Sequence, residues 1–445
     1  MKFDVSSLLL LYNLLFPVLF LLYLPVFITK LIRRGGSRRQ FAERFGIFSA
    51  AKKRVLRGLN KPVWVHAVSV GEAVAACTFI RQWHARDPNL YFVLSVTTTT
   101  GHAMAEKKLP PNTTLIYCPL DFYPFVRRTM SLVEPALMVI FEVEIWPNLV
   151  TLAARHGVPV TLVNARMSDK SARGYAKHRW LFGPIFHCFS LFCVQSKEDK
   201  QRIKRVVGDA VPVYTCNTMK FDQVPAPDET PDRAILDRVF GARQRLVWVA
   251  ASTHAGEEAM VAEIFKHLYA DVPGLKLVLV PRHHERTADV EKTLRYYSLN
   301  YAKFTELKPA SADIKMPPVD CLLVDTTGEL MKFMAMADLV FMGKTMAGNT
   351  GGHNIIEPAI LGRAIVHGTH MENFRQVNQA FREAKATWEV SNPRELEGAV
   401  RELCENASKR QNLGRAAKAV VAARRGAISR TLDLITPLLD RHHEG

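Results

Sequence analysis

Apolar and polar residues alternate along this chain in a pattern that predicts a parallel α/β architecture. Short apolar runs are each followed by a polar loop and then, in many cases, by a helical pattern. The first half contains six such runs and two clear helical segments. The predicted strands are Val63–Val68, Tyr91–Val96, Thr114–Tyr117, Leu137–Phe141, Val160–Asn164 and Leu191–Gln195, and the helices begin near Glu72 and cover about Asn148–Arg155.

The pattern stops at Val224–Asp232, a stretch rich in proline and acidic residues, and then restarts. The second half predicts strands at Leu246–Ala250, Leu275–Val280, Cys321–Val324, Leu339–Phe341 and Ala364–His367, helices near Gly256–Leu268 and Ile355–Leu361, and a helical tail from about Pro393. We therefore expect two Rossmann-like domains facing one another across a cleft, at residues 33–222 and 243–425, with a linker at 223–242. Residues 426–445 are expected to form a helix that packs back toward the first domain.

The N-terminal segment has a different pattern. Leu8–Ile28 carries no charge and is interrupted only by Asn13, Pro17 and Pro25. As a helix it would be roughly 31 Å long, close to the thickness of about 30 Å of a bilayer core. Residues 1–32 are therefore expected to form a membrane anchor, while an interfacial helix or a buried core helix stays open as an alternative.

Charge supports this placement. The chain has 59 Lys and Arg against 42 Asp and Glu, a net charge of +17. Residues 1–61 hold twelve of the basic and two of the acidic side chains. The cluster just after the apolar segment is expected on the cytoplasmic face of an inner membrane, against anionic lipids. It comprises Lys30, Arg33, Arg34, Arg38 and Arg39. Aromatic residues are not interleaved with these cations, so nucleic-acid binding is disfavoured.

Cysteine and metal-binding patterns exclude several other classes. Seven scattered cysteines form no CxxC pair, which argues against a disulfide framework and a zinc ribbon. The sequence also contains no DxD and no HExxH. We expect neither an obligatory metal nor a cofactor.

Ligands of such sheets bind outside the carboxyl ends of strands, so the residues that follow each strand are candidates. In the first half these are Glu72, the pair Glu142 and Glu144, and Arg166. A carboxylate there could act as a general base or position sugar hydroxyls, and an arginine could bind a carboxylate or phosphate. The alternatives are a first-turn helix acid at Glu72, a solvated loop at Glu142–Glu144 and a solvated basic helix face at Arg166.

In the second half, Ser252, Thr253 and His254 follow one strand, and Arg282 and His283 follow another. The strongest signal is the segment Gly348–Pro358, in which Gly351 and Gly352 precede a helix. Glycines there would leave the N–H groups of the helix open to a phosphate. Asn354 and Glu357 also resemble a capping box, although Glu357 could instead reach a ribose.

These motifs together resemble the 3-deoxy-D-manno-octulosonic acid (Kdo) transferases, which add Kdo to lipid A precursor. The resemblance covers nearly the whole chain in the family's order. It is carried by RRQFAERFG (38–46), WVHAVSVGE (64–72), EVEIWPN (142–148), NARMS (164–168), CNTMKFD (216–222), ASTHAGEE (251–258), PRHHER (281–286) and GGHNIIEP (351–358). The chain departs from the family's usual pattern at Val143 and Cys216.

The resemblance implies a GT-B fold and inverting transfer of Kdo from CMP-Kdo to lipid IVA, without a nucleotide-bound metal. It implies Glu72 as catalytic base and Glu142 as the second essential carboxylate. Acceptor contacts would come from Ser69, Gly71, Arg166, Arg38 and Arg39. Donor contacts would come from Ser252, Thr253, His254, Arg282, His283, Gly351, Gly352, Asn354 and Glu357. Another GT-B transferase or a nucleotide-sugar epimerase is the alternative.

Overall fold

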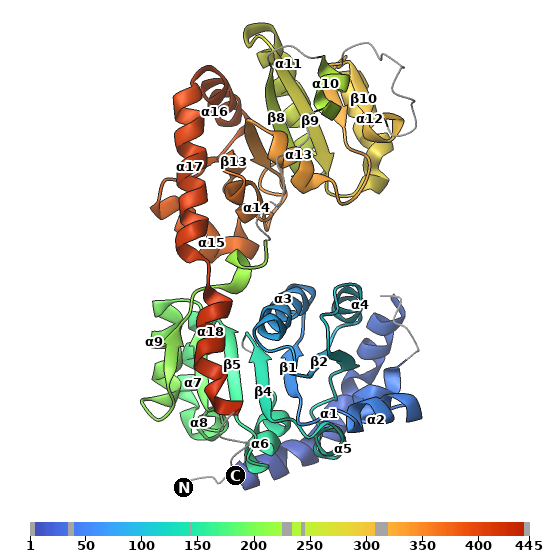
Figure 1. The fold of residues 1–445 in the computed structure, drawn as a ribbon, viewed down its shortest axis with the longest axis vertical. Helices are drawn as coiled ribbons and strands as arrows, with labels where there is room; N and C mark the ends of the chain where they lie inside the picture. The colour runs from blue at the N-terminus through green and yellow to red at the C-terminus, as the bar shows by residue number, and fades with distance from the viewer. Residues whose placement is uncertain are drawn as a thin grey trace. The chain divides into compact units, whose positions relative to one another are not determined.

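The computed structural model describes residues 5–33, 40–142, 145–224, 234–241, 245–307 and 319–439. The chain divides into two compact units (Figure 1). The first unit comprises Met1–Gln223 and Gly426–Gly445, and the second comprises Val224–Arg425. Each unit is built around its own parallel sheet, as the sequence predicts.

The sheet of the first unit has seven strands in the order β3-β2-β1-β4-β5-β6-β7, all paired in parallel. The strands are β1 (Val63–Ala67), β2 (Phe92–Val96), β3 (Thr113–Tyr117), β4 (Leu137–Phe141), β5 (Val160–Ala165), β6 (Leu191–Val194) and β7 (Val213–Thr215). The six predicted strands are confirmed within one or two residues. The sequence pattern missed β7, because three residues at a sheet edge are too few to show a period.

Helices cover both faces of this sheet (Figure 1). They are α1 (Val5–Arg33), α2 (Ala50–Arg57), α3 (Val70–Arg86), α4 (Thr99–Lys107), α5 (Tyr123–Val133), α6 (Pro147–Arg155), α7 (Asp169–Lys177), α8 (Arg179–Phe186) and α9 (Lys197–Val207), with short 3₁₀ turns η1 (Phe41–Phe45) and η2 (Met219–Phe221). Apolar side chains of α3 pack on one face, and those of α5 and α6 pack on the other.

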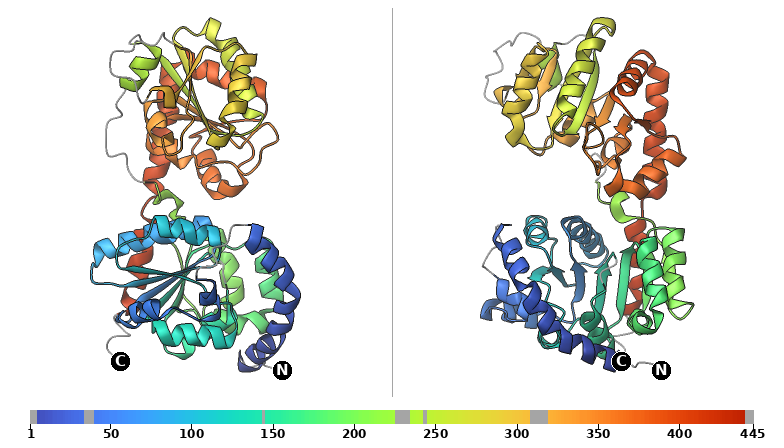
Figure 2. Two further views of the ribbon diagram at one scale, coloured as in Figure 1. Left: turned by 90° about the vertical axis from the view of Figure 1, so that its right-hand side faces the viewer. Right: turned by 180° about the vertical axis from the view of Figure 1, so that it is seen from behind.

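The C-terminal helix α18 (Ala427–Ile435) also belongs to the first unit (Figure 2). Its residues Ile428, Leu432 and Ile435 are buried in the same core as α3. The carboxylate of Asp222 accepts hydrogen bonds from the backbone amides of Gly426 at 2.7 Å and Ile428 at 2.8 Å. This carboxylate caps the positive end of α18 and fixes where the chain re-enters the first unit.

The second unit has a parallel sheet in the order β10-β11-β9-β8-β12-β13-β14. Its strands are β8 (Leu246–Thr253), β9 (Leu275–Pro281), β10 (Tyr301–Lys303), β11 (Cys321–Leu323), β12 (Leu339–Met342), β13 (Ala364–Gly368) and β14 (Trp388–Val390). Its helices are α10 (Ala234–Phe240), α11 (Glu257–Asp271), α12 (Thr287–Tyr296), α13 (Leu330–Met336), α14 (Ile356–Ile360), α15 (Arg375–Glu383), α16 (Pro393–Glu405) and α17 (Ala407–Arg424), with 3₁₀ turns η3 (His284–Arg286), η4 (Phe304–Leu307) and η5 (Glu372–Phe374). The edge strands β10 and β14 were again too short to predict.

Strand order reverses at the centre of each sheet. In the first unit the chain moves from β1 to β2 and β3, then returns to place β4 on the other side of β1. In the second unit β8 and β12 are the corresponding neighbours. The loops after these central strands leave in opposite directions, and this opening is where doubly wound sheets bind their ligands. The fold therefore gives each unit a candidate site, at the loops after β1 and β4 in the first and after β8 and β12 in the second.

Helix α1 packs on the first unit through the polar side chain of Asn13 and the ring of Phe16. The side chain of Asn13 exchanges hydrogen bonds with that of Asn148 at the start of α6, at 2.8 and 3.1 Å. Its oxygen also accepts the backbone amide of Tyr123 at 2.9 Å. The Phe16 ring stacks on Phe122. These contacts attach the N-terminal half of α1 to α5 and α6.

The outward face of α1 is aliphatic. Seven of its side chains are between 49% and 74% exposed, which is the reverse of a normal surface helix. They are Leu10, Leu11, Leu14, Leu15, Val18, Leu21 and Leu22. Among the described residues, no helix is long and apolar enough to cross a bilayer.

The contacts of Asn13 give a prediction about α1. Asn13→Ala removes an acceptor and a donor and leaves the Asn148 amide and the Tyr123 N–H without these partners. We expect a loss of about 1–3 kcal/mol in the free energy of unfolding. Urea unfolding and hydrogen exchange of the Tyr123 amide measure it. The exposed neighbour Leu14→Ala is the control, with an expected change within about 0.5 kcal/mol. Equal effects of the two variants would contradict the packing role of Asn13.

Candidate functional site

Glu72 lies in the first turn of α3, directly after β1, and 7% of its surface is exposed. One carboxylate oxygen accepts the Val68 amide at 2.9 Å and the other accepts the Ser69 amide at 3.3 Å. The Ser69 hydroxyl in turn accepts the Glu72 amide at 3.2 Å. This is a complete capping box, so Glu72 has the structural role that the sequence left open as an alternative. Each oxygen keeps a second lone pair, and the two amides hold the carboxylate in one orientation.

The helix begins at Val70, two residues before the start predicted near Glu72, so Gly71 lies inside its first turn. A Cβ at Gly71 would meet only the Ser69 hydroxyl, at 3.9 Å. Ser69 and Gly71 are both exposed beside Glu72. The glycine therefore leaves the first turn of α3 uncovered by a side chain.

Glu142 follows β4 on the other side of the switch point. Its backbone is left-handed, with φ at 56°, which is uncommon for a residue with a side chain and typical of functional loops. Burial raises the pKa of its carboxyl, and the nearby negative charge of Glu72 raises it further, whereas Arg166 and Lys220 lower it. The Arg166 guanidinium lies 4.0 Å from the Glu142 carboxylate. The structure therefore brings Glu72, Glu142 and Arg166 together, as the sequence predicts.

Lys220 is a fourth member of this group, and the sequence-based reasoning did not assign it a role. It lies on η2, which is attached to the end of β5 by a hydrogen bond from the Met219 amide to the Asn164 side chain at 3.0 Å. Burial and the neighbouring Arg166 lower the pKa of Lys220, and Glu142 raises it. Its place in the CNTMKFD motif was the available signal. Arg38 and Arg39, proposed as acceptor contacts, and Val143 and Glu144 lie outside the described residues.

In the second unit, two histidines meet at the switch point. His254 follows β8, and His353 lies in the loop between β12 and α14. Their Nε2 atoms are 3.1 Å apart and their rings are stacked, with His283 edge-on to His254. Burial, followed by surrounding cationic groups that include Lys344 and Arg282, lowers the pKa of His254 to about 4. Burial and the same surroundings lower the pKa of His353 to about 3. Both rings are therefore neutral at neutral pH, and the cationic groups around them create a positive potential that would attract an anion.

Ser252 and Thr253 differ from the expectation that they lie in a loop. Strand β8 continues through Thr253, because its pairing with β9 resumes at Thr253 and Pro281 after a register shift. Ser252 is 6% exposed and Thr253 is 0% exposed, so neither side chain is accessible to solvent. Arg282 and His283 are exposed, and the Arg282 amide donates to the carbonyl of Thr253 at 3.0 Å. Of the predicted donor residues in these two loops, His254, Arg282 and His283 are thus the accessible ones.

The glycine loop is organised by its own contacts. The Gly351 amide donates to the Glu372 carboxylate at 2.6 Å, and the Gly352 amide donates to the carbonyl of Lys344 at 3.0 Å. These two N–H groups are therefore occupied. The N–H groups expected to be open to a phosphate were those of the helix that follows. Both glycines have positive φ, and a Cβ on either would lie 2.5 Å from a side-chain atom of η5 or its flank. Close packing therefore explains why glycine occupies both positions.

Asn354 and Glu357 contact one another at the start of α14. The Asn354 amide donates to the Glu357 carboxylate at 3.2 Å, and its oxygen accepts the Ile356 amide at 3.3 Å. These contacts correspond to the capping role that the sequence analysis left open. The helix has only five residues.

Glu257 organises the loops of the second unit, and it was also missed. It is fully buried, and its two oxygens accept four backbone amides at 2.7–3.0 Å. The donors are His254, Lys344, Thr345 and Met346. Lys344 and Ser252 have positive φ, so this carboxylate holds the loops after β8 and β12 in a strained form. Lys344 and His353 could have been found by examining the residues after Leu339–Phe341 as closely as those after the other strands.

The described residues contain no group of three or more His, Cys, Asp or Glu side chains that could hold a metal ion.

The raised pKa of Glu142 gives a prediction about pH. A carboxyl with a pKa above its unfolded value stabilises the fold at low pH, and this contribution is lost as pH rises through the folded pKa. Glu142→Gln should therefore raise the unfolding temperature at neutral pH and lose this advantage in acid. The exposed Glu106→Gln should change neither. A fall in unfolding temperature at neutral pH for Glu142→Gln would contradict the burial of this charge.

Known structures share this fold. A putative UDP-N-acetylglucosamine 2-epimerase from Listeria monocytogenes aligns over 86% of this chain and 97% of its own, with 12% identity and a TM-score of 0.54. A glycosyltransferase from Rickettsia africae aligns over 85% of this chain and 99% of its own, with 11% identity and a TM-score of 0.54. The two units thus have a GT-B-like fold.

Sequence comparison identifies the family. The family model of 3-deoxy-D-manno-octulosonic-acid transferases matches residues 39–223. The 3-deoxy-D-manno-octulosonic acid transferase of Haemophilus influenzae is 30% identical over 91% of this chain and 92% of its own length. The enzyme of that name from Bordetella pertussis is 33% identical over 91% of this chain and 93% of its own. With this likeness along nearly its whole length, the chain belongs to the Kdo transferase family of glycosyltransferases.

Proposed function

We propose that this protein moves Kdo from CMP-Kdo to a lipid A precursor, lipid IVA, with inversion at the anomeric carbon. The observation that carries the proposal is the group of Glu72, Glu142, Arg166 and Lys220 at the switch point of a Kdo transferase N-terminal unit. It combines oriented carboxylates with cations, as expected of a site that must deprotonate a hydroxyl next to an acidic sugar.

Glu72 is the proposed general base. In the reaction the acceptor hydroxyl loses its proton to this carboxylate, its oxygen bonds to the anomeric carbon, and the bond from that carbon to the CMP phosphate breaks. The amides of Val68 and Ser69 hold the carboxylate at the carboxyl end of β1. They keep it oriented for proton transfer without blocking all of its lone pairs. Glu142, partly buried beside it, is the proposed second carboxylate, which positions the acceptor.

The cations near Glu142 bear on the negative charge of the donor sugar. Kdo carries a carboxylate, and Glu72 and Glu142 alone would repel it. Arg166 and Lys220 are the cationic side chains that interact electrostatically with Glu142. We assign them to charge compensation, so that an acidic sugar can approach a negative pair.

The second unit is the proposed site of CMP-Kdo. Its exposed Arg282 and His283, with Lys344 and the neutral His254–His353 pair, create positive potential where the CMP phosphate gains negative charge. Such groups stabilise the leaving phosphate without a metal ion. Glu257 supports this role by fixing the backbone of both loops. Asn354 and Glu357 remain candidates for the ribose.

We also propose that the protein works on the cytoplasmic face of the inner membrane. Helix α1 keeps its polar contacts on the protein and exposes seven aliphatic side chains. A helix with this distribution can lie in the bilayer interface. The acyl chains of the acceptor would then be in the same layer as α1.

Replacing the base tests the mechanism. Glu72→Gln keeps the shape of the side chain but removes its basicity, so Kdo transfer should fall by at least about a hundredfold. CMP binding, measured by calorimetry, should be unchanged because the proposed nucleotide residues lie in the second unit. The product is measured by mass spectrometry with CMP-Kdo and lipid IVA.

Glu106→Gln on α4 is the matched control, since Glu106 is exposed and near-normal turnover is expected. Near-normal turnover of Glu72→Gln, with an unfolding temperature close to that of the parent, would remove Glu72 from the role of base.

A further inference from the structure

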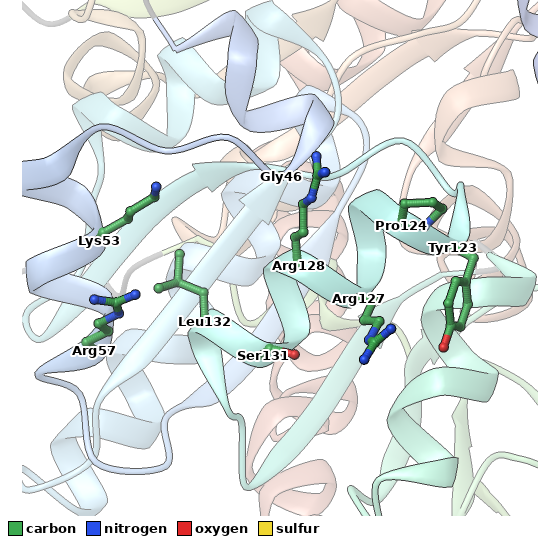
Figure 3. Close-up of a pocket in the computed structure, with 9 residues that line it drawn as sticks. All are labelled: Gly46, Lys53, Arg57, Tyr123, Pro124, Arg127, Arg128, Ser131 and Leu132. Atoms are coloured by element: carbon green, nitrogen blue, oxygen red, sulfur yellow. The ribbon is translucent and has the colours of Figure 1, made fainter.

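A basic pocket lies between α2 and α5, on the helical layer of the first unit (Figure 3). Its volume is ≈ 610 Å³. Lys53 and Arg57 project from α2, and Arg127 and Arg128 project from α5. The remaining lining residues are Gly46, Tyr123, Pro124, Ser131 and Leu132. Four cationic side chains, two hydroxyl-bearing side chains and two aliphatic side chains therefore line one cavity.

The charge of this pocket is not compensated by the described residues. No ion pair joins Lys53, Arg57, Arg127 or Arg128 to a described carboxylate, and all four are exposed. The neighbouring Lys52 shows the contrast, because it pairs with Glu43 at 2.9 Å. Four like charges around one cavity repel one another, so the pocket would bind an anion favourably.

The pocket is shaped by a close approach of backbone. Gly46 has φ at 70°, and a Cβ there would lie 2.8 Å from the carbonyl oxygen of Phe125 and 3.0 Å from the Cβ of Arg128. Only glycine allows the turn after η1 to rest on α5 in this way. Ser49 then caps α2 by accepting the Lys52 amide at 3.2 Å. The cations of α2 are thus held opposite those of α5 by local structure.

Helix α1 contacts a residue that lines this pocket. Tyr123, which lines it, donates its backbone amide to Asn13 of α1. The adjacent Phe122 stacks on Phe16 with ring centroids 5.3 Å apart. The exposed aliphatic residues Leu14, Leu15 and Val18 lie on the turns of α1 around these two contacts. A cationic cavity and an exposed aliphatic helix are therefore neighbours.

We propose that the α2–α5 pocket binds the phosphate of an anionic glycerophospholipid of the bilayer, in addition to the reacting acceptor. The inference rests on the membrane association proposed above and assigns it a headgroup site. Arginine and lysine supply the charge-assisted hydrogen bonds that a phosphate accepts. The aliphatic face of α1 is the surface on which the acyl chains of that lipid would lie. A free phosphate would contact the cations of the pocket but not the aliphatic face of α1.

Vesicle flotation with the full chain tests this site. The probes are vesicles of phosphatidylcholine alone and of phosphatidylcholine mixed with phosphatidylglycerol. The parent protein should prefer the anionic vesicles. The triple variant Lys53→Gln, Arg57→Gln and Arg127→Gln should lose at least about tenfold in partitioning to them. Inorganic phosphate should not displace the parent protein from the anionic vesicles when the ionic strength is held constant.

Two controls make the result specific. Lys266→Gln, Arg415→Gln and Lys418→Gln remove the same charge from exposed positions on α11 and α17 and should leave flotation within about twofold of the parent. Arg57→Lys with Arg127→Lys keeps the charge and should retain binding. All variants are compared by thermal unfolding, and Kdo transfer to detergent-dispersed lipid IVA should be unchanged in the triple variant.

Each other outcome has a defined meaning. Flotation of the triple variant equal to that of the parent overturns the pocket proposal, as does competition by inorganic phosphate. A raised KM for lipid IVA in detergent would assign the pocket to the acceptor and also overturn it. If the parent itself binds neither vesicle, the proposed membrane association is wrong. Kdo transfer in detergent is a separate measurement and tests the proposed function independently.

Discussion

The structure depends on one recurring constraint: backbone amides at the carboxyl ends of the parallel strands need acceptors, and buried carboxylates supply them. Glu257 accepts four such amides, Asp121 accepts two at the start of α6, and Glu72 accepts two before α3. A carboxylate has about four acceptor positions, so a single side chain can fix a whole loop. The loops that carry the site are therefore held in place without any ligand.

In the proposed mechanism, the two units differ in charge and therefore in the step that each serves. The switch point of the first unit has two carboxylates with two cations beside them, which suits proton removal from a hydroxyl near an acidic sugar. The switch point of the second unit has cations and two neutral histidines, which suits an anionic leaving group. Left-handed backbone at Glu142, Ser252 and Lys344 marks the same strand ends. Strain of this kind is retained where the surrounding contacts enforce it.

Strand periodicity predicted most of both sheets, and the rule that ligands bind beyond the carboxyl ends of strands selected Glu72, Glu142 and Arg166 as candidates. The short edge strands β7, β10 and β14 gave no period to detect. Lys220, His353 and Glu257 were missed for a different reason: their roles arise from contacts between loops far apart in sequence. The occupied amides of Gly351 and Gly352 could not be foreseen either, because their partners lie on Glu372 and Lys344. An uncharged run at α1 predicted its apolar character, but not that Asn13 and Tyr12 would face the protein.

In the proposed arrangement, α1 links the first unit to a lipid substrate, because Asn13 contacts the protein and seven aliphatic side chains are exposed. The proposal that this protein joins Kdo to a lipid A precursor is tested by the mass of the product. Purified full-length chain is incubated with CMP-Kdo and lipid IVA, and the lipid is examined by mass spectrometry. We expect the lipid to gain the mass of one or more Kdo residues as CMP is released. Release of CMP with the lipid mass unchanged, or a sugar gained only from another nucleotide donor, would contradict the account.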